Sequence, residues 1–218
     1  MNSLLKTYRD KADDLFEKAG KYACYSRGIE FQKQSISELE NFKSEIEEQK
    51  GKAVSVEDND SSNAFESLNL VTQAMICEFE MWVHLKSENF DEAWDFLIDA
   101  QNNAVWSMQA HEINGHLTKY VSRLNLLEKV LFPPQLFFSD RSVISKSECS
   151  ICQKSIDDCE HLKGKFYMGK QCVEIIGQID KIHAYDIVKD PANKKCRAQN
   201  FTEDNKTIDL MTYREIKK

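Results

Sequence analysis

Four zinc-competent side chains fall within thirteen residues of this 218-residue chain. Cys149 and Cys152 form a Cys-x2-Cys pair, and Cys159 and His161 follow after a gap of six residues. Zn²⁺ prefers tetrahedral thiolate and imidazole ligands, and a two-residue gap lets one tight turn present two thiolates. In an extended segment, residues two apart point to the same face, so the second pair can reach the same ion. The motif predicts a zinc site formed by Cys149, Cys152, Cys159 and His161.

Four protein ligands fill the coordination shell of zinc. A filled shell leaves no position for water or substrate, so the motif predicts a structural ion rather than a catalytic ion. Cys172 is an alternative ligand, because it can replace His161 if the chain folds back after Gly164. The compact set closes a shorter loop at a lower cost in chain entropy. A third interpretation is that these are ordinary cysteines in a loop.

The composition favours a folded, helix-rich protein that stays in the cytoplasm. Hydrophobic residues make up 41% and charged residues 30%, with seven Gly and three Pro. No apolar run approaches the ~20 residues that span a bilayer. Residues 1–10 are charged where a signal peptide needs its apolar stretch. In a reducing cytoplasm the clustered cysteines are expected to bind metal and not to form disulfides.

The charge is distributed unevenly along the chain. Residues 141–218 carry 15 Lys and Arg against 12 Asp and Glu, so residues 1–140 carry 14 against 24. An acidic amino-terminal part is a poor candidate for binding phosphate backbones, where affinity comes largely from neutralising phosphates. Only the mildly basic carboxyl-terminal part is a candidate for nucleic-acid binding.

Residues 1–134 are predicted to form a bundle of four or five helices. Apolar residues recur at three- and four-residue steps in several segments, and Pro133-Pro134 ends the last one. The heptad-like spacing in the first two segments is compatible with coiled-coil-like packing, within the chain or against a second copy. Residues 51–63, polar and acidic, are predicted to be a mobile linker. The first stripe comprises Leu5, Tyr8, Ala12, Leu15, Ala19, Tyr22 and Ala23.

Residues 135–218 are predicted to form a small zinc-stabilised α+β module, rich in β-structure. Residues 135–139 are short and apolar, which favours an extended segment that docks the module against the bundle. Further along, β-branched and aromatic runs bounded by Gly164, Gly169 and Gly177 predict short strands. Residues 208–216 are a candidate for one more strand. The predicted fold class is therefore mainly α, with a helical bundle first and a small zinc module second.

The zinc motif and the residues after it resemble a compact module of uncharacterised bacterial and phage proteins. In some of these proteins the module lies near sequences similar to phage head maturation proteases. The resemblance covers residues 149–198, and it implies a prokaryotic or phage-related origin and a bound metal, without implying an activity. No Ser and His pair matches such a protease, so only the zinc ligands are carried over. The matching residues beyond the motif are Gly164, Tyr167, Gly169, Cys172 and Asp190-Pro191-Ala192-Asn193.

Other catalytic signatures are mostly absent from the sequence. His111 and His116 are five residues apart, whereas the histidines of a helical metalloprotease motif are four apart and share one face. Asn114-Gly115 between them is a turn signal, which favours surface or capping roles for both histidines. The chain has no phosphate-cradling loop, no GxGxxG and no GxSxG motif. An enzyme is therefore the less favoured interpretation.

Three classes of function stay open at this point. The favoured one is a non-enzymatic interaction or adaptor protein, in which the helices present a surface for a protein partner or for self-association and zinc stabilises the carboxyl-terminal module. The second is nucleic-acid binding by that module, which steep loss of binding with added salt would support. The third is an enzyme of unrecognised type. The cations of the second interpretation are Lys163, Lys165, Lys170, Lys194, Lys195 and Arg197, around Phe166 and Tyr167.

Overall fold

The helices of the protein precede its strands. The computed structural model describes residues 3–23 and 26–216, and the side chains of Tyr22 and Ala23 lie outside the description. The predicted fold class is confirmed within these ranges, because five helices come first and a small β-containing part with the Cys/His motif follows. The helices are α1 (Ser3–Ala23), α2 (Ile29–Ser55), α3 (Asn59–Lys86), α4 (Phe90–Ala110) and α5 (Thr118–Leu131).

α3 lies at the centre of the bundle. It packs along α2 on one side and along α4 on the other, while α1 contacts α2 and α3, and α5 contacts α4. Leu5, Ala12 and Ala19 of α1 are buried against the other helices, so the apolar stripe of the first segment is used inside the bundle. Coiled-coil association with a second copy stays a prediction.

The predicted linker at residues 51–63 is wrong in its extent. α2 continues to Ser55 and α3 begins at Asn59, so only residues 56–58 connect the two helices. The side chain of Asp58 accepts a hydrogen bond from the Ser61 N–H, which caps α3. Polarity misled the prediction, because Ser61, Ser62 and Asn63 are buried and Asn63 has hydrogen-bond partners far along the chain.

Two long strands dominate the part that follows the bundle. β1 (Phe137–Cys149) and β4 (Glu174–Val188) pair antiparallel as a two-stranded ribbon. The other strands form two small hairpins, and the prediction of only short strands after residue 135 is wrong for the ribbon. Gly177, predicted as a strand boundary, lies inside β4. The small strands are β2 (Phe166–Tyr167), β3 (Lys170–Gln171), β5 (Asn200–Glu203) and β6 (Lys206–Asp209), and the short 3-10 helices are Glu112–Asn114 and Ile156–Asp158.

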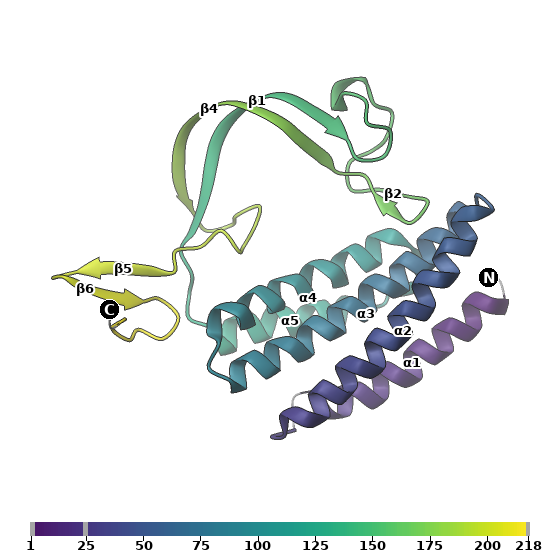
Figure 1. The fold of residues 1–218 in the computed structure, drawn as a ribbon, viewed down its shortest axis with the longest axis horizontal. Helices are drawn as coiled ribbons and strands as arrows, with labels where there is room; N and C mark the ends of the chain where they lie inside the picture. The colour runs from purple at the N-terminus through teal and green to yellow at the C-terminus, as the bar shows by residue number, and fades with distance from the viewer. Residues whose placement is uncertain (1–2, 24–25, 217–218) are drawn as a thin grey trace.

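The ribbon arches over the bundle from the end of α5 to the amino-terminal end of α3 (Figure 1). Its register shifts where β4 carries one extra residue, at Gly177, Asp180 and His183, and where β1 carries an extra Ser145. Such β-bulges bend the strand that contains them and increase its twist. Repeated bulges, mostly on one strand, account for the curvature of the arch.

The bulges also bring apolar residues that are three positions apart in the sequence onto the same face of the ribbon. Tyr185, Ile182 and Ile179 pair with residues 140, 142 and 144 of β1, which share a face because strand side chains alternate. Phe138 and its partner Ile187 lie on the same face, opposite the buried Phe137. We call this surface the isoleucine face; it comprises Phe138, Ile144, Ile179, Ile182, Tyr185 and Ile187, all of them exposed.

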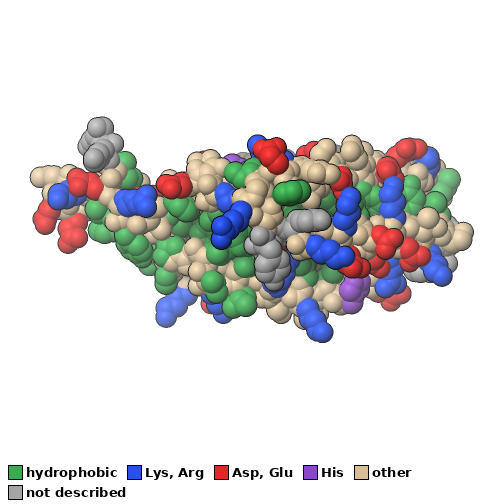
Figure 2. Space-filling view, turned by 90° about the horizontal axis from the view of Figure 1, so that it is seen from below, with side chains coloured by type: hydrophobic (Ala, Val, Ile, Leu, Met, Phe, Trp, Pro, Cys, Tyr) green, Lys and Arg blue, Asp and Glu red, His purple; other side chains and the backbone are tan. Residues whose placement is uncertain are grey.

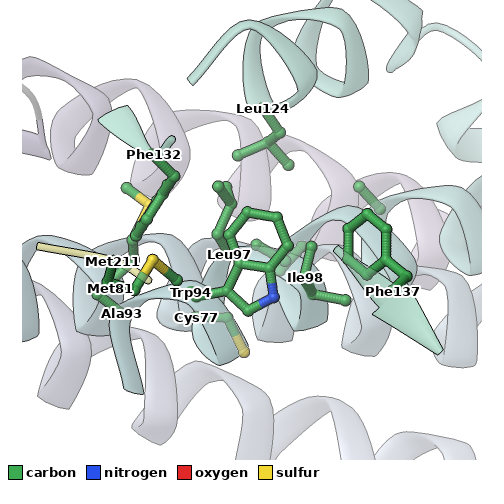
Figure 3. Close-up of a cluster of buried hydrophobic side chains, with 13 residues drawn as sticks. Cys77, Met81, Ala93, Trp94, Leu97, Ile98, Leu124, Phe132, Phe137 and Met211 are labelled. Carbon is green, nitrogen blue, oxygen red and sulfur yellow. The ribbon is translucent and has the colours of Figure 1, made fainter. Parts of the chain in front are cut away.

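The near end of the ribbon is anchored in the hydrophobic core of α3, α4 and α5. Trp94 of α4 lies among Phe132, Phe137 and Met211 (Figure 3). Its ring centroid is 5.4 Å from that of Phe132 and 6.1 Å from that of Phe137. The indole N–H donates a 3.1 Å hydrogen bond to the Lys194 carbonyl. The polar group of this buried side chain therefore has its hydrogen-bond partner in the segment that follows the ribbon.

The far end is anchored on the first turns of α3. The side-chain amide of Asn63 donates to the Phe166 carbonyl at 3.2 Å, and its oxygen accepts from the Gly169 N–H at 2.9 Å. Asn59 accepts from the Met168 N–H at 2.8 Å. Gly169 has a φ of +71°, and a Cβ there would lie 3.2 Å from the Ser62 carbonyl oxygen, so glycine permits the close approach.

Replacing Asn63 with Ala is expected to lower the free energy of unfolding by about 1–3 kcal/mol, because two buried hydrogen-bond partners lose their match. Chemical denaturation of the purified protein measures the change. Asn102→Ala is the matched control, since Asn102 is exposed on α4. Equal losses in both variants would contradict the anchoring role of Asn63.

Candidate metal centre

The four predicted zinc ligands converge at the far end of the ribbon. Cys149 is the last residue of β1, and Cys152, Cys159 and His161 lie in the loop that follows. One potential ligand atom from each of the four lies within 4.8 Å of those of the other three. The compact ligand set is therefore grouped so that it can bind a metal ion.

The spacing within this group, which we call the zinc centre after the ion that the sequence predicts, fits a tetrahedral ion. The Cys152 and Cys159 sulfur atoms are 3.5 Å apart, and the Cys159 sulfur is 3.3 Å from His161 Nδ1. With Zn–S bonds of about 2.3 Å, the edge of a ligand tetrahedron is about 3.8 Å, and slightly less where nitrogen is one of the donors. Three sulfurs and one imidazole at these separations are the chemistry that zinc prefers.

Local hydrogen bonds build the turn that carries the first two cysteines. The Cys149 N–H donates to the Lys154 carbonyl at 2.9 Å, and the Gln153 N–H donates back to the Cys149 carbonyl at 2.8 Å. Gln153 closes this turn with a φ of +59°. The Ile151 N–H points at the Cys149 sulfur at 3.4 Å. The Cys-x2-Cys spacing therefore produces the tight turn that the sequence predicted.

The second pair of ligands follows a single 3-10 turn. Asp157 and Asp158 lie in that turn, and the Cys159 N–H donates to the Ile156 carbonyl. The His161 ring packs edge-on against Tyr167, with centroids 4.7 Å apart. The Tyr167 hydroxyl in turn accepts from the Leu162 N–H at 3.0 Å, which positions the ring that supports the histidine.

A fifth donor, Cys172, lies against the zinc centre. Its sulfur is 3.7 Å from that of Cys149, and both residues are fully buried. The chain folds back after Gly164 as the alternative ligand set requires, because the Cys172 N–H donates to the Lys165 carbonyl at 2.7 Å. Contact with Cys149 keeps Cys172 available as the alternative to His161, and the choice of fourth ligand stays a prediction.

The thiols of the centre have opposite pKa shifts. The Cys152 N–H lowers the pKa of Cys149 to about 6, and the Ile151 N–H acts in the same direction. Desolvation raises the pKa of Cys159 to about 11, and the neighbouring thiols add to this effect. The pKa of Cys172 is also raised, by desolvation and by Cys149. Metal binding must therefore displace protons from the cluster.

His111 and His116 do not form a second metal site in the described part of the chain. Among those residues, the potential metal ligands that lie close together are those of the zinc centre. His111 Nδ1 accepts from the Ile113 N–H at 3.1 Å, which caps the short 3-10 helix. Its Nε2 lies 3.2 Å from an Asp60 carboxylate oxygen. His116 is exposed in the turn before α5, in keeping with the capping and surface roles that were predicted.

Most of the cations proposed for nucleic-acid binding are paired with carboxylates. Arg197 is buried and pairs with Asp91, while Lys194 pairs with Glu128 at 2.7 Å. Phe166, in β2, is buried and is not available for stacking on bases. On the face shown in Figure 2, Lys and Arg side chains are interspersed with Asp and Glu. The remaining pairs are Lys163–Glu174 and Lys195–Asp99.

No family model, no curated protein and no solved structure matches this chain. The resemblance to zinc modules of bacterial and phage proteins therefore stays a prediction, and so does the origin that it implies. None of the helices in the described ranges combines the length and the hydropathy needed to cross a bilayer.

The sequence did not reveal the residues that support the zinc centre. The β2–β3 hairpin beside the centre is held to α3 by contacts of Asn59, Asn63 and Gly169. These residues are separated from one another by up to 110 residues of chain. The only local signal was the glycine in the Met168-Gly169 turn. The two asparagines looked like loop residues, because their partners come from a distant hairpin.

Replacing Cys152 with Ser is expected to remove one ligand and to increase hydrogen exchange at the far end of the ribbon, because the binding free energy of a structural ion contributes to folding. Residues near Phe137 should stay protected, since the Trp94 core anchors them. Hydrogen exchange read by mass spectrometry resolves the two ends. Cys196→Ser, an exposed cysteine outside the centre, is the control; unchanged exchange in both variants would contradict a structural role for the ion.

Zinc binding is expected to release more protons as the pH is lowered. Near neutral pH, Cys159 holds a proton that the metal must displace, whereas Cys149 is mostly thiolate. Below about pH 6 Cys149 also becomes protonated, so proton release rises and apparent affinity falls. Calorimetric titrations at about pH 7.5 and about pH 5.5, in buffers of different ionisation enthalpy, count the protons. Equal release at both values would contradict the low pKa of Cys149.

Proposed function

We propose that this chain is a non-enzymatic, zinc-containing interaction protein. In this proposal a structural Zn²⁺ fixes the far end of the ribbon, and the ribbon presents the isoleucine face to a protein partner. The sequence favoured the helices as the partner surface. The distribution of exposed apolar side chains favours the ribbon, and this observation carries the proposal.

The isoleucine face is large for a surface that only meets solvent. Its six side chains are 40–70% exposed. At ~180 Å² for a large side chain, the exposed parts amount to ~550 Å². The largest apolar patch on a typical monomer is about 300–600 Å² and is often functional. An apolar face of this size on a narrow ribbon supports a role in binding.

The position of the zinc centre supports a structural use of the ion. A two-stranded ribbon has no interior of its own, and isolated hairpins are marginally stable in water. The centre joins the end of β1 to the loop that returns towards β4, at the opposite end of β1 from the Trp94 core. Four protein donors also leave no open coordination position for a substrate, which favours a structural ion over a catalytic one.

Nucleic-acid binding is the second candidate, and it has less support. Four of the six proposed cations are engaged with carboxylates of the same chain, which reduces the charge available to phosphates. Lys165 and Lys170 are both exposed and are the remaining two. Two lysines give a small electrostatic contribution to binding a polyanion.

Site-specific photocrosslinking in cells that produce the protein tests the proposed function. A photoreactive residue at Ile182, in the isoleucine face, is expected to give a discrete adduct, because a bound partner lies against that side chain. The matched control places the same residue at Leu126, which is 59% exposed on α5. Gel electrophoresis and mass spectrometry identify the adducts.

The two positions separate the alternatives. A discrete adduct from position 182 that is lost in the Cys152→Ser variant supports a zinc-held partner surface on the ribbon. Adducts from position 126 alone would move the partner surface to the helices. No discrete adduct from either position would contradict an interaction role.

A further inference from the structure

The zinc centre has one more donor than a tetrahedral ion can use. Three cysteines and His161 form the mutually close group, and the sulfur of Cys172 touches that of Cys149. We propose that a peroxide oxidises this centre to a form with two disulfides, Cys152–Cys159 and Cys149–Cys172, and thereby releases the zinc ion. The inference rests on the proposed function, because it makes the structural ion removable.

The four thiols fall into two close pairs. The Cys152 and Cys159 sulfurs are 3.5 Å apart, and the Cys149 and Cys172 sulfurs are 3.7 Å apart. A disulfide bond of about 2.05 Å requires the sulfurs of each pair to approach by only about 1.5 Å. Four cysteines allow three pairings. The two close sulfur–sulfur contacts correspond to one of them, Cys152–Cys159 together with Cys149–Cys172.

The backbone holds the partners of the inner pair side by side. Next to Cys149, the Ser150 N–H donates to the Val173 carbonyl at 3.0 Å, and the Val173 N–H donates to the Ser150 hydroxyl at 2.9 Å. These bonds join the ends of the two chain segments whether or not a metal is bound. Cys149 and Cys172 therefore stay neighbours when the ion leaves.

The two pairs differ in their access to solvent. Cys152 and Cys159 are partly exposed, whereas Cys149 and Cys172 have no exposed surface. A dissolved peroxide therefore meets the outer pair first. Loss of both outer ligands leaves the ion with Cys149, His161 and Cys172, and oxidation of the inner pair then removes all remaining thiolates.

The chemistry balances with the peroxide as the oxidant. One thiolate attacks a peroxide oxygen, which breaks the O–O bond and gives a sulfenic acid and hydroxide. The second thiolate of the pair attacks that sulfur, forms the S–S bond and expels a second hydroxide. Two sulfurs together lose two electrons, and the two hydroxides take up protons to become water. Each zinc ion released thus consumes two molecules of hydrogen peroxide.

The experiment treats the zinc-loaded full-length protein with hydrogen peroxide and follows the metal with a chromogenic chelator. We expect the loss of one equivalent of zinc, and peptide mapping should find both proposed disulfides. Dithiothreitol and added zinc should restore the starting form. Cys196, exposed and outside the centre, serves as an internal standard for thiol oxidation.

The outcomes separate this inference from the proposed function. Cys172→Ser should form only the Cys152–Cys159 disulfide, and Cys149 should accumulate higher oxidation states that dithiothreitol does not reverse. Zinc retained while Cys196 is oxidised, or disulfides with another pairing, would overturn the inference without contradicting the proposed structural role of zinc. A protein that binds no zinc before any oxidation would instead overturn the proposed function.

Discussion

A two-stranded ribbon cannot bury its own side chains, and the β1–β4 ribbon therefore depends on being held at both ends. One end enters the core around Trp94, whose ring contacts both Phe132 and Phe137. The other end is gathered by the zinc centre and tied to the start of α3 through Asn63. Between these anchors β1 runs for 13 residues, about 43 Å if fully extended, and its curvature lets it cross the bundle.

The two anchors differ in kind, and the difference matters for how the ribbon can change. The Trp94 anchor results from the burial of apolar side chains. This burial does not depend on any single bond, and it persists as long as the bundle is folded. The proposed zinc centre depends on thiolate chemistry, so protons and oxidants would compete with a bound metal for its sulfurs. Chemical conditions can thus act on one end of the ribbon while leaving the other in place.

Residues 51–63 and β4 show how local composition can mislead. Asn63, which is buried near the start of α3, looked like a linker residue, because its hydrogen-bond partners are more than 100 residues away. In β4 the isoleucines recur every third residue, which matches neither the period of a strand nor that of a helix. Bulges at every third position convert this spacing into a single apolar face, and they depend on pairing with β1.

The sequence by itself determined the helical bundle and the clustered Cys/His motif, because both follow from short-range patterns. A helix needs apolar residues at neighbouring turns, and a Cys-x2-Cys pair makes its own turn. Only the tertiary structure decided that Cys172 reaches the centre, that the strands around it form one long arch, and that Asn59 and Asn63 support it. Those features arise from contacts between segments far apart in the chain, and spacing along a sequence carries no record of such distances.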